Sequence, residues 1–251
     1  MDRPLEGKVA LVTGGGIRLG RAIVEGLARA GAHVAVHFHA SRSGADATVE
    51  SLKAQGHVAQ AFQADLTDTA TIAPLVERVE AGLGPVSVLV NSAALFERNA
   101  FLDTPLESLD RQWALNARAP FLLTQEVARR MAGRGGGDVV NVLDIGGAKL
   151  AWRNYAAYCM SKAALGMLTQ CLALELAPAI RVNGVLPGTV LPPESSSPEE
   201  LERLRASIPQ KSFGSPSDIA DAVLFFLTGP RFVTGQLLAV DGGRSLGIAP
   251  R

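Results

Sequence analysis

The sequence predicts a Rossmann-type α/β fold, a doubly wound, seven-stranded parallel sheet with helices on both faces. Short β-branched apolar runs alternate with helix-period segments from one end of the chain to the other. This alternation is typical of a parallel sheet with crossover helices. The strand candidates are almost continuously apolar, as expected for strands that are buried on both faces. A glycine-rich stretch follows the first strand candidate and precedes a helix candidate.

These patterns predict the elements in chain order. The strand candidates are Lys8–Thr13, His33–Phe38, Val58–Gln63, Val86–Asn91, Asp138–Leu143, Ile180–Leu186 and Gln236–Val240. The helix candidates are Leu19–Ala30, Ala45–Gln55, Thr69–Ala81, Leu106–Met131, Ala156–Ala177 and Ser217–Leu227. Helix ends and starts are marked by Gly31, Gly56 and the Pro216–Asp218 segment, as helix punctuation requires. Because crossover connections between parallel strands are right-handed, only a few strand orders are compatible with these elements.

One insertion, at about residues 188–215, interrupts the alternation. It is rich in Pro and Ser and contains a short charged helix candidate, Pro198–Ser207. Open α/β sheets bind ligands beyond the carboxyl ends of their strands, so we interpret the insertion as a substrate lid. A solvated surface excursion is the alternative. With no internal repeat, the whole of residues 1–251 is expected to form one domain.

Composition and charge exclude several function classes. Lys plus Arg and Asp plus Glu both total 24, and this balance argues against binding to nucleic acid. We find no signal peptide and no membrane span of roughly 18 apolar residues, and we predict no metal site. Cys159 and Cys171 fall on one helix candidate, about 18 Å apart and too far for a disulfide. Free thiols favour a cytoplasmic location.

The glycine-rich turn runs from Thr13 to Gly20. Glycines at such a turn let the backbone approach a pyrophosphate, and the following helix N-terminus offers unpaired N–H groups. We therefore expect a dinucleotide to bind at Gly14, Arg18, Leu19 and Gly20.

The segment after the second strand candidate decides between NADH and NADPH. An NADH-binding fold carries an acid there, which hydrogen-bonds the ribose 2′-hydroxyl. Here no acid occurs before Asp46. The side chains that stand in its place are His37, His39, Ser41 and Arg42. Because these groups and Arg18 would attract a 2′-phosphate, the predicted cofactor is NADPH.

Tyr158 and Lys162 are the predicted catalytic pair. At positions i and i+4 of a helix candidate, their side chains share one face. An ammonium group beside a phenol lowers the pKa of the phenol toward the range of a general acid.

Over its whole length the chain resembles the short-chain dehydrogenase/reductase family. The resemblance implies that Asp65 and Leu66 contact the adenine and that Asn91 and Ala93 belong to the family's cofactor-binding segment after the fourth strand. It implies that Asn116 supports a proton-relay water. Pro187–Gly188 corresponds to the turn beside the nicotinamide, where Lys162 also binds the ribose, and Asp241–Gly243 to the C-terminal signature. The family usually forms homotetramers.

Within that family the chain is most similar to the pteridine reductase branch. Arg18 replaces a glycine of the turn, and the family's usual serine, 13 residues before the tyrosine, is missing. Asp144, 14 residues before Tyr158, stands in its place. The resemblance implies that Phe96 stacks on a pterin, that Arg18 contacts the phosphate and the pterin, and that Asp144 joins Tyr158 in moving protons. Asp144 as a strand-end cap and Phe96 as a core residue are the alternatives.

The sequence thus predicts an NADPH-dependent reductase that transfers hydride to a ring C=N bond of a small pteridine substrate, with Tyr158, Lys162, Asp144 and Asn116 as catalytic residues. Arg18, Phe96, Asp144 and Tyr158 would contact the substrate. A carbonyl reductase acting on a 3-oxoacyl thioester or a small ketone is the alternative enzyme. An NADP-sensing regulator on the same fold is the alternative that is not an enzyme.

Overall fold

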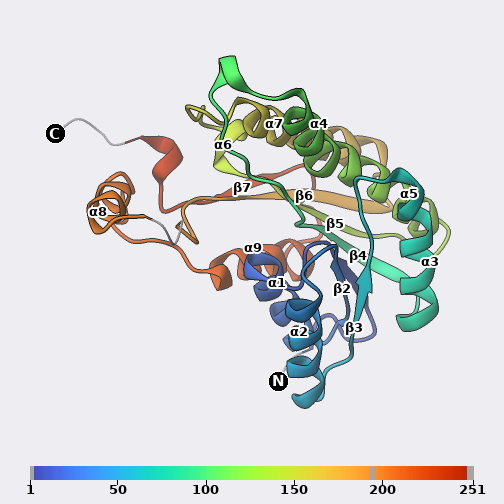
Figure 1. The fold of residues 1–251 in the computed structure, drawn as a ribbon. Coiled ribbons are helices and arrows are strands. Elements are labelled where there is room, and N and C mark those ends of the chain that lie inside the picture. Colours follow the sequence, from blue (N-terminus) through green and yellow to red (C-terminus); the bar gives the residue numbers. More distant parts are fainter. Residues whose placement is uncertain (1–2, 193–195, 248–251) are drawn as a thin grey trace.

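The computed structural model describes residues 3–192 and 196–247. Their strands form one parallel sheet in the order β3-β2-β1-β4-β5-β6-β7. The strands are β1 Val9–Val12, β2 His33–Phe38, β3 Ala59–Gln63, β4 Val86–Asn91, β5 Gly137–Val142, β6 Ile180–Pro187 and β7 Leu237–Val240. Figure 1 shows the sheet running through the middle of the molecule, with helices above and below it. The predicted doubly wound, seven-stranded sheet is confirmed.

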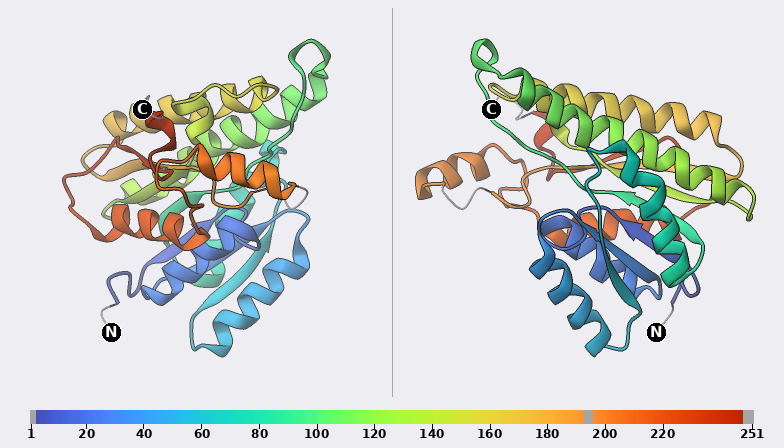
Figure 2. Two further views of the ribbon diagram at one scale, coloured as in Figure 1. Left: turned by 90° about the vertical axis from the view of Figure 1, so that its left-hand side faces the viewer. Right: turned by 45° about the vertical axis from the view of Figure 1, so that its right-hand side comes forward.

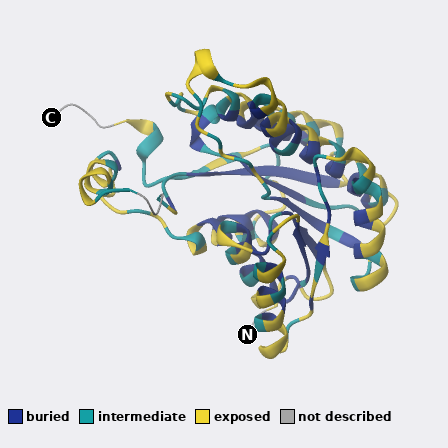
Figure 3. Ribbon diagram, viewed as in Figure 1, coloured by how far each residue is buried: buried dark blue, intermediate teal, exposed yellow. Residues whose placement is uncertain are grey.

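Three helices pack on each face of the sheet. One face is covered by α1 Arg18–Arg29, α2 Arg42–Ala54 and α9 Pro216–Thr228, and the other by α3 Ile72–Leu83, α5 Ala119–Ala132 and α7 Ala156–Glu175. The remaining pieces are α4 Leu106–Trp113, α6 Ile145–Ala148, α8 Pro198–Ala206 and the short helical turns η1 Thr69–Thr71, η2 Phe101–Asp103, η3 Ala114–Arg118 and η4 Arg244–Leu246. Figure 3 shows the buried residues concentrated in the strands and in the helix faces that cover them.

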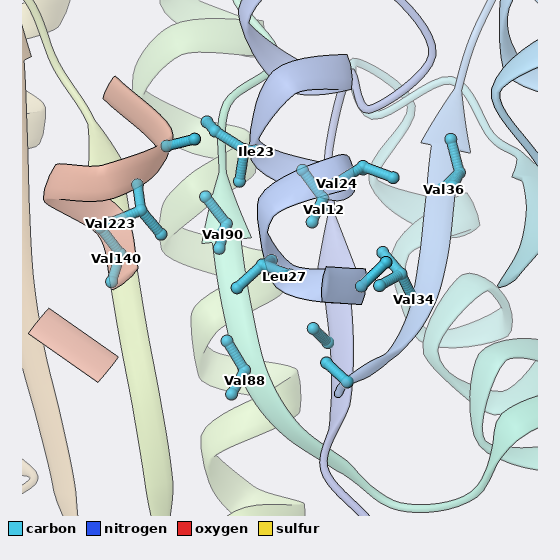
Figure 4. Close-up of a cluster of buried hydrophobic side chains, with 14 of the residues drawn as sticks. Val12, Ile23, Val24, Leu27, Val34, Val36, Val88, Val90, Val140 and Val223 are labelled. Carbon is cyan, nitrogen blue, oxygen red and sulfur yellow. The ribbon is translucent and has the colours of Figure 1, made fainter. Parts of the chain in front are cut away.

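Valines dominate the core between the sheet and α1. Figure 4 shows Val12, Val34 and Val90 on neighbouring strands, facing the side chains of Ile23 and Leu27. All five side chains are at most 1 % exposed. β-Branched side chains suit a strand that is covered on both faces, and burial of each contributes about 1.5–3 kcal/mol. This core fixes the positions at which the strands end.

The predicted single helix Leu106–Met131 is wrong. The chain instead forms α4, one wide π-helical turn at Ala114–Arg118, and then α5. Pro120 stands in the first turn of α5, where a missing N–H is tolerated. π-Turns of this kind occur mostly at functional sites, and this one carries Asn116.

The site lies beyond the carboxyl ends of the strands. The strand order reverses at β1, which has β2 on one side and β4 on the other, and in open α/β sheets ligands bind at such a reversal. In Figure 2 the ribbon of α8, which follows β6, projects from this end of the sheet. The predicted insertion 188–215 includes α8, but its residues 193–195 lie outside the described residues. Across the described ranges, none of the helices is both long and apolar enough to cross a membrane.

Candidate active site

The glycine-rich turn joins the end of β1 directly to α1. A Cβ on Gly20 would overlap the carbonyl oxygen of Gly14, so glycine is required for this close packing. Leu19, beside it, is half-buried against the core. No side chain caps the first N–H groups of α1. These donors are therefore available to a phosphate.

The hydroxyl of Thr13 ties the turn to the segment that follows β4. Its oxygen accepts hydrogen bonds from the backbone N–H groups of Ser92 at 2.9 Å and Ala93 at 3.0 Å. The predicted cofactor residues at the ends of β1 and β4 are therefore held together.

Arg18 has a left-handed backbone, with φ of 52°. For a residue with a side chain this conformation costs about 1–2 kcal/mol, which explains why related turns carry glycine at this position. The Arg18 side chain is exposed. A strained residue at a ligand-binding turn is a frequent mark of function.

The carboxyl end of β2 is ringed by polar side chains. His39 is exposed, Ser41 precedes α2, and the Arg42 guanidinium donates to Gln63 Oε1 at 3.2 Å. The Asp65 carboxylate lies 3.8 Å from His39 Nε2 and accepts from the N–H and hydroxyl of Thr67, at 2.9 Å and 2.7 Å. Leu66 beside it is buried. At the end of β2, where an NADH-binding fold has its acid, this chain has His39, Ser41 and Arg42.

Two predicted cofactor residues lie behind the turn instead of facing the crevice. The His37 ring accepts from the Gly14 N–H at 3.2 Å and donates to the Ala64 carbonyl, with the two atoms 3.1 Å apart. Burial lowers the pKa of His37 to about 4, so the ring is neutral. The buried Asn91 amide donates to Asn141 Oδ1 at 2.8 Å. Both side chains support the site from inside the core.

Asn116 holds α7 against the segment after β4. Its amide nitrogen donates to the Leu95 carbonyl at 2.9 Å and to Ser161 Oγ at 3.1 Å, and its oxygen accepts from the Leu95 N–H at 2.8 Å. Ser161 in turn donates to the carbonyl of Tyr158 at 2.7 Å. The π-helical turn brings Asn116 into this position, at 0 % exposure.

Tyr158 and Asp144 form a direct hydrogen bond. The Tyr158 hydroxyl donates to Asp144 Oδ2 at 2.9 Å, and the Gly146 N–H donates to Asp144 Oδ1 at 2.7 Å. Asp144 therefore caps α6 and also bonds to Tyr158, so a capping role does not exclude a role beside Tyr158. Burial raises the pKa of the Asp144 carboxyl to about 6.

The expected lowering of the Tyr158 pKa by Lys162 is outweighed in this structure. Burial, followed by the Asp144 charge, raises the pKa of Tyr158 well above its ordinary value. The buried Lys162 ammonium donates to the Val142 carbonyl at 2.8 Å, and burial lowers the pKa of Lys162 to about 8. Tyr158 is therefore a neutral phenol with a proton to give.

Aromatic rings surround the Tyr158 side chain. Phe96 is 52 % exposed, so it is not a core residue. Its ring stacks on Tyr155 with centroids 4.5 Å apart and meets Tyr158 edge-on at 4.7 Å. Trp152 lies parallel to Tyr158 at 6.3 Å. Trp152 and Tyr155 were not predicted, and because both precede α7, no helical periodicity links them to Tyr158 in the sequence.

The last part of the site comes from the ends of β6 and β7. Pro187 is buried at the end of β6, and the Gly188 N–H donates to the Val240 carbonyl at 2.9 Å. A Cβ on Gly188 would lie 2.5 Å from Asp241 Cα, so the segments that follow β6 and β7 are in direct contact. Arg244, which was not predicted, donates from Nη1 to Thr189 Oγ1 at 2.6 Å.

The comparisons with known proteins cover almost the whole chain. Residues 16–245 match the family model described as "Enoyl-(Acyl carrier protein) reductase". The chain is 36 % identical to 2,3-dihydro-2,3-dihydroxybenzoate dehydrogenase of Bacillus subtilis over 259 residues, covering 97 % of this chain and 98 % of that protein. It is 38 % identical to L-xylulose reductase of Mesocricetus auratus over 250 residues, covering 97 % and 98 %.

A solved structure is similarly close. FolM alternative dihydrofolate reductase 1 from Brucella suis, in complex with NADP, superimposes with a TM-score of 0.90 at 34 % identity, covering 97 % of each chain. Fold, glycine turn and sequence similarity agree over the full length. The chain therefore belongs to the short-chain dehydrogenase/reductase family.

Proposed function

We propose that the protein is an NADPH-dependent reductase that transfers hydride to a ring C=N bond of a pteridine, such as a biopterin, a dihydropterin or a dihydrofolate. The observation that carries the proposal is the hydrogen bond of 2.9 Å between the Tyr158 hydroxyl and the Asp144 carboxyl. A serine at this place would mainly orient a carbonyl group, whereas a carboxyl can pair with an amino-pyrimidine edge or exchange a proton with a ring nitrogen. The similarity to a dihydrofolate reductase structure supports the same substrate class.

The residues present fit NADPH. The uncapped turn of α1 suits a pyrophosphate, and the segment after β2, which carries His39, Ser41 and Arg42 and no acid of its own, suits a 2′-phosphate. The residues that would hold the cofactor are Gly14, Arg18, Leu19, Gly20, His39, Ser41, Arg42, Asp65, Leu66, Ala93, Lys162, Pro187 and Gly188, with His37 and Asn91 behind them. When bound, NADPH supplies the hydride.

The protein's own residues supply the proton. Tyr158 is a neutral phenol, and it can give its proton to the substrate atom that hydride transfer makes basic. Because Asp144 has a pKa of about 6, it gains a proton easily and can return one to Tyr158 or hold the ring nitrogen. Asn116 has one acceptor site left on its amide oxygen, which suits a water that replaces the proton.

The aromatic rings and the insertion would hold the substrate. Phe96 offers an exposed ring at the edge of Tyr158, where a flat heterocycle could stack. The segment 188–215, which carries α8, would serve as the substrate lid. Residues 1–251 would act as one domain.

We also propose a homotetramer in the cytoplasm. Apolar side chains that would suit contacts between copies are exposed on α4, α5 and α7. They are Leu106, Trp113, Phe121, Met160, Met167 and Leu174. Both cysteines are free thiols, as is usual in a reducing compartment.

A carbonyl reductase is the second candidate, and the 38 % identity to an L-xylulose reductase favours it. Asp144 in place of a serine argues for the pteridine. The sensor alternative would predict damage to the catalytic set, whereas Tyr158, Lys162 and Asn116 are all present.

The test is NADPH oxidation against biopterin, dihydrobiopterin, dihydrofolate, an acetoacetyl thioester and simple ketones. We expect turnover of at least one pterin or folate. Turnover of ketones or thioesters alone would exclude the pteridine assignment. NADPH binding without any turnover would favour the sensor.

A further inference from the structure

Arg244 connects the C-terminal turn to the start of the insertion. It opens the short turn η4 after β7, and its Nη1 donates to Thr189 Oγ1 at 2.6 Å. The Asp241 carboxylate fixes this turn, because it accepts from the N–H groups of Gly243 at 2.9 Å and Ser245 at 2.7 Å. The guanidinium is therefore held at the carboxyl ends of β6 and β7, beside the Pro187–Gly188 turn.

The charge of Arg244 is not balanced by an ion pair within residues 3–192 and 196–247. The side chain is half-buried. Burial lowers the pKa of Arg244, although the nearby charges of Asp144 and Asp241 act in the opposite direction. The Arg244 charge also acts on the catalytic carboxyl, where it lowers the pKa of Asp144 against the larger effect of burial. A half-buried cation at the carboxyl ends of β6 and β7, whose charge reaches Asp144, is a feature that the proton chemistry does not use.

We propose that Arg244 binds an anionic group of the substrate, a carboxylate carried on or next to the ring that is reduced. The proposal rests on the proposed reductase function and names its substrate class more closely. With Nη1 bonded to Thr189, the other guanidinium N–H groups can form the parallel pair of bonds that a carboxylate accepts. A bound carboxylate would also favour the protonated form of Asp144, the form that can supply a proton.

The test compares binding of a carboxylate and its isosteric amide to enzyme saturated with NADP⁺. Calorimetry would use 6-carboxypterin against pterin-6-carboxamide, and benzoate against benzamide, with wild type, Arg244→Gln and the exposed control Arg29→Gln in the last turn of α1. Wild type and the control should prefer the carboxylate of at least one pair by about 10- to 100-fold. Arg244→Gln should bring this ratio to about 1, and Arg244→Lys, which keeps the charge but not the planar fork, should restore part of it.

The outcomes separate the two proposals. An Arg244-dependent preference for benzoate, with neither pterin bound, would support the anion site and defeat the pteridine assignment. No carboxylate preference in wild type, or an unchanged preference in both Arg244 variants, would overturn the anion site. The anion site would also be overturned if Arg244→Gln raised the Kd for NADPH and left the carboxylate preference intact. Arg244 would then bind the cofactor diphosphate.

Discussion

Replacing Asp144 by Asn should make the stability of the ligand-free protein less dependent on pH. The pKa of the Asp144 carboxyl is raised from 3.8 to about 6 in the fold. Below pH 3.8 the carboxyl is protonated in the folded and the unfolded chain, and its contribution to stability is fully present. As pH rises to 6, the unfolded chain loses this proton first, so the folded state becomes less stable. At about 1.36 kcal/mol for each pKa unit, the loss reaches about 3 kcal/mol.

An asparagine keeps the shape of the site without the charge. Its oxygen can accept from the Gly146 N–H, and its amide nitrogen can donate to the Tyr158 hydroxyl, so both contacts of Asp144 have a replacement. The assay is urea unfolding of ligand-free wild type and Asp144→Asn at a fixed protein concentration, between about pH 4.5 and 8. Relative to wild type, the free energy of unfolding of the variant should gain about 2 kcal/mol over this range. Asp110→Asn, on an exposed position of α4, is the control for loss of one charge.

A constant difference between the two unfolding free energies, within about 0.5 kcal/mol across the range, would refute the reasoning. It would mean that the Asp144 carboxyl is already ionised at the lowest pH, and a group of ordinary acidity could not exchange a proton with the substrate near neutral pH. A gain that the Asp110→Asn control reproduces would have the same consequence.

Three further predictions concern catalysis and the cofactor. Tyr158→Phe should lower kcat by about 10²- to 10⁴-fold with an unchanged Kd for NADPH by fluorescence titration, and full activity would remove its role as proton donor. Arg18→Gly should relieve the φ of 52° and raise the free energy of unfolding by about 1 kcal/mol, while NADPH binds more weakly; a loss of stability would show that the side chain supports the turn. Arg42→Ala should raise the KM for NADPH about tenfold and leave the KM for NADH unchanged, and an equal effect on both cofactors would defeat the 2′-phosphate assignment.

The strands could be predicted well because each is a short, β-branched run buried on both faces. β2 and β4 have the predicted bounds, and the other strands differ by a single residue at one or both ends. The break between α4 and α5 could not be predicted, since the apolar periodicity continues through it. Its cause is tertiary, because Asn116 bonds to Leu95 and Ser161, which are distant in the sequence.

The chemistry of the site was partly readable from residue types. Tyr158 and Asp144 were expected to act together, and they are hydrogen-bonded. The inward placement of His37 was not readable, because a strand covered on both faces gives no polar–apolar alternation to show where a side chain points. Arg244 was missed for a different reason: it lies 100 residues after Asp144, and only the parallel sheet brings their charges together.

The turn after β5 explains how an aspartate one residue further from the tyrosine than the usual serine still reaches the hydroxyl. Gly147 has φ of 88°, and a Cβ there would overlap the carbonyl of Cys159 on α7. A Cβ on Gly146 would lie 2.8 Å from the Trp152 ring, so that ring packs directly on this glycine. Gly146 and Gly147 let the longer turn pack closely against α7 and the Trp152 ring. The extra residue is therefore absorbed in the turn, and the carboxyl keeps its contact with Tyr158.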